Sequence, residues 1–134
     1  MPHEGYSAEG GPGGVLTAYD PSTGRSAWRK SANGDVQALT VMGAEVYAGG
    51  HFLTFSGYAR QFFAAVDGAT GAVDPTWAPS AYGANCSSAW PPDPCDDSVW
   101  AMEADPSMGR LYAGGDFRKV SGAAHAGFAQ FSRR

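Results

Sequence analysis

Two cysteines in one short stretch of the chain offer the clearest chemistry. Cys86 and Cys95 are nine positions apart in a segment rich in proline. Such a pair indicates a local disulfide and an oxidising compartment, and so short a ring would restrict the unfolded chain by roughly 2–3 kcal/mol. The alternative is two free thiols. Redox chemistry of the Cys-x-x-Cys type is excluded by the spacing.

The same segment carries Trp90 and three aspartates, Asp93, Asp96 and Asp97. Three carboxylates could hold Ca²⁺ together with backbone carbonyls, but their spacing fits no EF-hand, so we favour a solvated acidic loop over a calcium site. A stapled loop with a tryptophan at its tip is also where a protein or glycan ligand would bind. We therefore expect Trp90 and Asp93 to be the contact residues of a binding loop.

Two glycine pairs resemble phosphate-binding loops. Gly49-Gly50 and Gly114-Gly115 each end a short apolar run, whereas a phosphate loop needs glycines that open a helix. We expect both pairs to form turns or bulges, with Phe52 and Phe117 as buried plugs beside them.

No catalytic constellation can be assembled from the remaining residues. The histidines, His3, His51 and His125, share no metal-ligand spacing. The serines and aspartates lie in turns, where they cap the backbone, and no nucleophile, base and orienting group come together. The sequence therefore predicts no catalytic residue, no bound cofactor other than the weak calcium candidate, and no enzyme activity.

The elements that position these residues are short strands. The 134 residues fit one domain, and 43% hydrophobic with only 16% charged residues indicates a globular chain. Nineteen glycines and nine prolines indicate many tight turns, as in all-β proteins. The net charge of -4 argues against nucleic acid, and Arg133-Arg134 is interpreted as a solvated tail. No apolar run is long enough for a membrane span.

A repeat organises the strands. Tyr47-Ala-Gly-Gly and Tyr112-Ala-Gly-Gly are 65 positions apart, and the turns that end at Gly24 and Gly71 are 47 apart. Each turn combines an aspartate that can accept backbone N–H bonds with a glycine suited to a left-handed conformation. A unit of about 45 residues with four short strands has the size of a β-propeller blade.

These spacings predict an all-β partial β-propeller of about two to two and a half four-stranded antiparallel blades. Residues 1–14 are interpreted as a flexible lead-in and 15–134 as the repeat region. Within that region we expect a partial blade (15–34), a full blade (35–80), an insertion loop (81–97) and a second partial blade (98–134). Trp28 and Trp77 are expected to be buried between blades.

The motif from Val46 to Phe52, with Ser56-Gly57, Arg60, the run from Phe63 to Gly71 and Asp74-Pro-Thr-Trp-Ala-Pro79, resembles the delta-60 class of β-propeller repeat. That class occurs in large, mostly bacterial, secreted or surface proteins, and the resemblance implies a blade scaffold to which no catalytic residue belongs. Residues 15–28 are equally similar to the quinoprotein-type propeller repeat. The last copy departs from the pattern, since His125 stands in the place of Arg60.

We therefore expect a non-catalytic scaffold or binding module of a secreted or cell-surface protein, although the N-terminus has no signal-peptide pattern. The alternatives are part of a quinoprotein-like propeller enzyme that uses pyrroloquinoline quinone, or a carbohydrate-binding propeller. Two blades cannot close a ring. The expectation is that further blades of a larger propeller complete it, with a homo-oligomer as the alternative.

Overall fold

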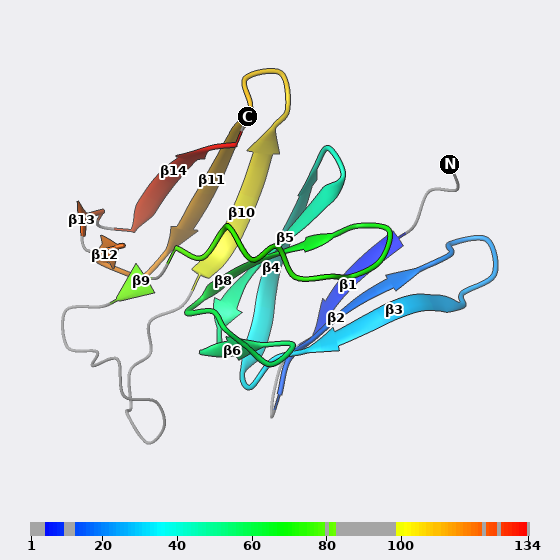
Figure 1. Cartoon of the computed structure of the whole chain (residues 1–134). Helices are drawn as coiled ribbons and strands as arrows, with labels where there is room; N and C mark the ends of the chain where they lie inside the picture. The colour runs from blue at the N-terminus through cyan, green and yellow to red at the C-terminus, as the bar shows by residue number, and fades with distance from the viewer. Residues whose placement is uncertain are drawn as a thin grey trace.

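The computed structural model describes residues 5–9, 13–79, 81–82, 99–121, 123–125 and 127–133, and these contain strands and turns but no helix. The all-β prediction is thus confirmed. No helix long and apolar enough to cross a membrane occurs among them. The strands form three larger antiparallel sheets and two small ones (Figure 1).

Sheet 1 consists of β1 (Gly5–Glu9), β2 (Val15–Tyr19) and β3 (Ser26–Ser31) in that order. The prediction of a flexible lead-in over residues 1–14 is therefore wrong for β1, which pairs with β2 along its whole length. The reason lies in Tyr6, whose ring packs on Trp28 at 6.0 Å and whose hydroxyl donates a hydrogen bond to the Gly68 carbonyl. These contacts hold a glycine-rich segment in place.

Sheet 2 consists of β4 (Asp35–Met42), β5 (Glu45–His51) and β8 (Phe63–Asp67). A fourth strand was expected near Trp77, but it is reduced to one isolated bridge between Val66 and Val73. Sheet 3 has the same plan, with β10 (Val99–Asp105), β11 (Arg110–Gly115) and β14 (Phe128–Ser132). Among the described residues, these three larger sheets thus have three strands each, where four-stranded blades were expected.

Two small hairpins occupy matching places beside sheets 2 and 3. The first pairs β6 (Thr54–Phe55) with β7 (Tyr58–Ala59). The second pairs β12 (Lys119–Val120) with β13 (Ala123–Ala124), and β9 (Ala81–Tyr82) adds to it. Each hairpin turns at a serine with positive φ, Ser56 at 51° and Ser121 at 50°. The 65-residue spacing therefore extends to backbone conformation.

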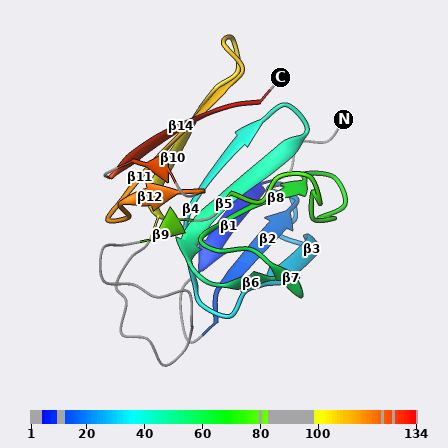
Figure 2. The ribbon, with the colours of Figure 1, turned by 60° about the vertical axis from the view of Figure 1, so that its left-hand side comes forward.

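The three sheets lie side by side in chain order, with sheet 2 in the middle (Figures 1 and 2). Two apolar clusters fill the spaces between them. The first joins sheets 1 and 2 and includes Leu16, Trp28 and Val46. The second joins sheets 2 and 3 and includes Phe63, Trp77 and Leu111. Full burial of one such side chain contributes about 1.5–3 kcal/mol, so the sheets stabilise one another mainly through these two layers.

The glycine pairs lie within strands, not in turns. Gly49-Gly50 is part of β5 opposite a register shift between Val36 and Ala38, and Gly114-Gly115 faces the same shift between Val99 and Ala101. Each pair therefore faces a β-bulge on the neighbouring strand. A Cβ atom at Gly50 would clash with the carbonyl oxygen of Asp35, so the bulge requires a residue without a side chain. The prediction that these glycines form turns is wrong, and the predicted bulge lies on the strand opposite them.

The aspartate-glycine turns and the phenylalanine plugs match the sequence prediction. Asp67 accepts hydrogen bonds from the backbone N–H groups of Ala69 and Thr70, and Gly71 has a φ of 79°. The equivalent Gly24 has a φ of 76°. Phe52 is 0% exposed and Phe117 is 1% exposed, so both are buried as expected.

Candidate functional site

The predicted binding loop lies outside the described residues. This applies to Cys86, Cys95, Trp90, Asp93, Asp96 and Asp97, and also to His3. The disulfide, the calcium candidate and the binding role of this loop therefore stay predictions.

Within the described residues, ionisable groups meet at the junction between sheets 2 and 3. Arg133, directly after β14, donates through Nη2 to Glu45 Oε1 at 3.2 Å and to Asp74 Oδ2 at 3.1 Å. Its Nε donates to the hydroxyl oxygen of Tyr47 at 3.1 Å, and that hydroxyl donates to Glu45 at 3.0 Å. One guanidinium group thus binds two carboxylates and a phenol of the neighbouring sheet.

Two aromatic rings pack against the Arg133 guanidinium group. The Arg133 guanidinium carbon lies 5.4 Å from the centre of the Trp77 ring and 5.8 Å from that of Tyr47. The two rings meet edge to face at 5.1 Å. Because an arginine over aromatic faces gains cation–π attraction as well as ion pairing, the side chain is held in one orientation.

The pKa values of the two carboxyl groups in the cluster are shifted in opposite directions. Burial raises the pKa of Glu45, and the neighbouring carboxyl of Asp74 raises it further. The hydroxyl of Thr76 donates to Asp74 at 2.7 Å and, as the largest of several causes, lowers the pKa of Asp74 to about 2. Burial raises the pKa of Tyr47. Such divergence occurs at catalytic carboxylate pairs, but it also occurs in structural ion-pair networks.

A pocket of about 430 Å³ lies beside the cluster, and the described residues that line it are Met42, Gly43, Glu45, Tyr47, Pro106, Gly109 and Arg133. Its only cation, Arg133, is already bound by two carboxylates and a hydroxyl group, and the pocket lining contains no serine, cysteine or histidine that could act as a nucleophile or base. Arg133 and its partners thus form a latch, an ion-paired and hydrogen-bonded link between sheets 2 and 3.

Arg133 corrects the sequence interpretation. We had expected a solvated tail, yet the side chain of Arg133 is only 23% exposed. Its backbone N–H donates to the Gly109 carbonyl, as the N–H of Gly68 donates to Ala44 in the preceding sheet. The 65-residue spacing therefore places Arg133 in the repeat position of Gly68, and this spacing was the signal that could have identified it.

The same position joins sheets 1 and 2 in another way. There the carbonyl of Gly68 accepts hydrogen bonds from the indole N–H of Trp28 at 3.0 Å and from the Tyr6 hydroxyl at 3.2 Å. Trp28 is 9% exposed and Trp77 is 6% exposed. The prediction that both tryptophans are buried between successive units is thus confirmed at the level of sheets.

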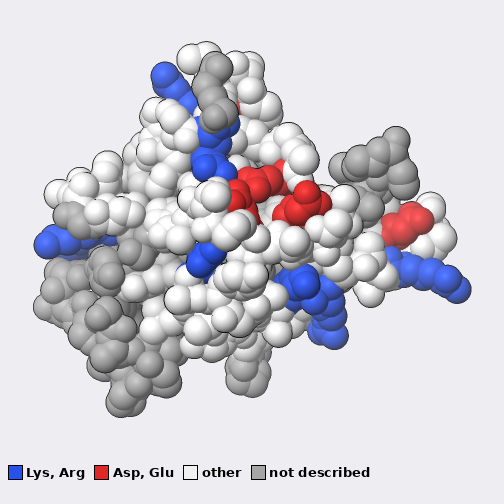
Figure 3. All heavy atoms as spheres, viewed as in Figure 1, with Lys and Arg blue, Asp and Glu red and all other residues white. Residues whose placement is uncertain are grey.

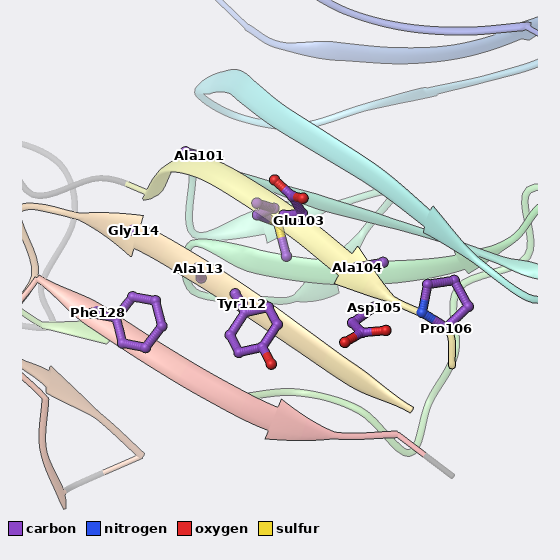
Figure 4. A pocket seen from close by; sticks show the side chains of 10 residues that line it. Ala101, Glu103, Ala104, Asp105, Pro106, Tyr112, Ala113, Gly114 and Phe128 are labelled. Carbon is purple, nitrogen blue, oxygen red and sulfur yellow. The ribbon is translucent and has the colours of Figure 1, made fainter. Parts of the chain in front are cut away.

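A second pocket, of about 650 Å³, opens on the outer face of sheet 3, away from sheet 2. Figure 4 shows Tyr112 and Phe128 side by side on this face, and their rings stack at 6.0 Å. Phe128 is 55% exposed. An aromatic pair therefore lies on a face of sheet 3 that no other described sheet covers.

The remaining candidates have structural surroundings. His51 stacks on Phe62 at 5.6 Å, and His125 is exposed. Arg60 is 8% exposed, donates to the carbonyls of Ala59 and Asp74, and fastens the first hairpin to the body of the protein. No group of three potential metal ligands comes together in the described segments.

Charge is sparse on the face of the molecule seen in Figure 3, where a small group of acidic side chains lies beside basic ones and most of the surface is uncharged.

Comparisons of the chain with protein-family models, with curated proteins and with solved structures gave no match.

Proposed function

We propose that this chain is a non-catalytic β-propeller repeat scaffold, of the delta-60 type, that acts as a binding module of a secreted or cell-surface protein. Its ligand is a protein or a glycan that binds at the loop bearing Trp90 and Asp93. The sheets supply rigid support for that loop, and further sheets complete the ring.

The carrying observation is that one mode of sheet packing occurs twice. Tyr6 pairs with Ala18 in sheet 1 as Tyr47 pairs with Ala65 in sheet 2, and each tyrosine packs on a buried tryptophan. Gly68, directly after the third strand of sheet 2, accepts hydrogen bonds from Tyr6 and Trp28. Arg133, directly after the third strand of sheet 3, donates a hydrogen bond to Tyr47. A stack built by repetition supports a scaffold, since stability is spread over many similar interfaces.

The ionisable cluster supports the non-catalytic part of the proposal. Its members bind one another across two sheets, which occupies the groups that an active site would need for a substrate. In such a scaffold, ligand binding falls to segments that lie outside the repeat pattern. The stretch that contains Cys86 and Cys95 is the clearest interruption of that pattern.

A glycan array with purified protein tests the ligand class. We expect binding to a defined set of glycans that Trp90→Ala abolishes. Trp100→Ala is the matched control, because Trp100 is 54% exposed on β10 and belongs to the repeat. If reconstitution with pyrroloquinoline quinone and calcium gives a quinone-specific absorbance band, the proposal is wrong and the enzyme alternative holds.

A further inference from the structure

The outer face of sheet 3 has an equivalent in each of the other two sheets. In sheet 1 the equivalent face is covered by sheet 2, and in sheet 2 it is covered by sheet 3. The 65-residue spacing relates Tyr112 to Tyr47 and Phe128 to Phe63, and both pairs hold the same register in their sheets. Tyr47 is 2% exposed and Phe63 is fully buried, because sheet 3 packs over them. Phe128, in the same position one sheet later, is 55% exposed.

Gly49 and Gly114 make the comparison sharper. A Cβ atom at Gly49 would lie 2.5 Å from Cγ1 of Val99 and 3.0 Å from the sulfur of Met102. Gly49 is therefore a hole in sheet 2 into which side chains of the next sheet fit. At Gly114 the one described atom within 4 Å of a Cβ would be the carbonyl oxygen of Gly127, at 3.7 Å. The equivalent hole in sheet 3 is open, and it lines the pocket of about 650 Å³.

We propose that this face, centred on Gly114, Tyr112 and Phe128, is the docking surface for a further three-stranded sheet of the same repeat. That sheet places a valine equivalent to Val99 in the hole at Gly114. The inference rests on the proposed function insofar as it takes the sheets to be successive repeat units, and it adds the partner and the contact residues.

The charges specify the partner further. In sheet 2, Glu45 accepts a hydrogen bond from Arg133 of the next sheet. In sheet 3 the equivalent position is Arg110, which pairs in register with Ser132 as Glu45 pairs with Asp67. Because the charge at this position is reversed, the docking sheet carries a carboxylate where sheet 3 carries Arg133.

A second copy of this chain is a poorer occupant. In head-to-tail stacking its exposed end would be sheet 1. The outer face of sheet 1 holds Gly5, Ser7, Thr17 and Tyr19 at the register positions of Val46, Ala48, Ala64 and Val66. The described part of sheet 1 also has no strand equivalent to β10 from which a valine could enter the hole. Of the four apolar positions that cover the Tyr47 face of sheet 2, that face therefore keeps only the aromatic one, as Tyr19.

The test extends the chain by one repeat period. Residues 69–134 are appended after Arg133, with Arg133→Glu in the appended copy, and urea unfolding is measured for the native and the extended protein. Gly114→Val is expected to change the unfolding equilibrium constant of the native protein by less than about threefold, since the hole is open. In the extended protein, Gly114→Val in the original copy should raise this constant more than about tenfold, because the appended sheet fills the hole.

Gly49→Val is the matched control, and it should destabilise both proteins equally. The charge assignment predicts that an appended copy that retains Arg133 docks more weakly than the copy with glutamate. The proposal is overturned if Gly114→Val has the same effect in both proteins, or if the appended segment stays unfolded beside a folded native part. Light scattering that finds a native dimer, dissociated by Gly114→Val, would assign the face to a second copy and also overturn it. None of these results depends on glycan binding, so the two proposals fail separately.

Discussion

Tyr47 and Tyr112 occupy the same register position in successive sheets, but only Tyr47 is enclosed. Its ring is 2% exposed between β5 and sheet 3, edge to face with Trp77 at 5.1 Å. Tyr112 instead stacks on the half-exposed Phe128 on the open side of the last sheet. The protein thus contains the same surface twice, once covered and once uncovered, and this provides matched positions for mutation.

The indole hydrogen bond between sheets 1 and 2 is the first place to test. Trp28→Phe removes the donor to the Gly68 carbonyl but keeps an aromatic ring between the sheets. We expect the free energy of unfolding to fall by about 1–3 kcal/mol, since the loss leaves a buried acceptor with one partner fewer. Chemical denaturation measures it. Arg29→Phe, a change at the neighbouring exposed residue of the same strand, should have a much smaller effect.

Backbone conformation gives a second prediction. Gly127 has a φ of 78°, and its N–H and carbonyl groups bond Phe117 and Gly115 in sheet 3. We expect Gly127→Ala to destabilise the protein by about 1 kcal/mol or more, because an L-residue is strained at positive φ. The matched position is Phe62, at a φ of 72°.

Phe62→Gly should therefore relieve strain while it removes a buried ring. Thermal unfolding is expected to show a loss of stability smaller than the usual 3–5 kcal/mol for removing a buried phenylalanine. A full loss at Phe62, together with no effect at Gly127, would contradict this account of the strain.

The two carboxyl groups bound by Arg133 predict a pH dependence. Hydrogen bonds from Thr76, and to a smaller extent the Arg133 charge, lower the pKa of Asp74 from 3.8 to about 2. A lowered pKa contributes stability that is present above pH 4 and is lost as the pH falls towards 2. Asp74→Asn should flatten this part of the stability profile, which is measured by unfolding at a series of pH values.

Glu45 acts in the opposite direction. Burial raises its pKa above 4.5, so its protonated form favours folding, and this contribution is lost as the pH rises through the raised pKa. Glu45→Gln is expected to remove that loss. An unchanged profile in both variants would show that the two carboxyl groups are not held as the structure describes.

The cysteine pair can be tested without any mutation. If the chain is exported to an oxidising compartment, non-reducing peptide mapping should find Cys86 linked to Cys95. Reduction should then lower the free energy of unfolding by about 2–3 kcal/mol, because the unfolded chain regains freedom. Free thiols in protein exported to the periplasm would count against the extracellular assignment.

Much of the fold follows from the sequence because its repeats are visible there. The spacing between Gly49 and Gly114 predicts equivalent strands, and the aspartate-glycine turns have the predicted backbone bonds. The strand β1 was missed, since the glycines around it favour a loop by composition. Its Gly-Tyr-Ser-Ala pattern nevertheless matches Val46 to Gly49, and tertiary contacts of Tyr6 outweigh the weak local propensity.

The ionisable cluster was missed for a different reason. Glu45 and Asp74 belong to one predicted unit and Arg133 to the next, so no spacing within one unit brings the three together. Only the arrangement of neighbouring sheets does so. The open face of sheet 3 is also invisible in the sequence, because Tyr112 and Phe128 have the same residue types as core positions elsewhere in the repeat or closely resemble them.

The central claim, that each sheet presents the same face to the next, is tested most directly by comparing Tyr47→Ala with Tyr112→Ala. Urea unfolding of the 134-residue protein at low concentration should show a loss of about 3–5 kcal/mol for Tyr47→Ala, whose ring is enclosed between two sheets. For Tyr112→Ala the loss should be below about 1.5 kcal/mol, because solvent replaces the ring on an open face. Equal losses at the two positions would contradict the claim.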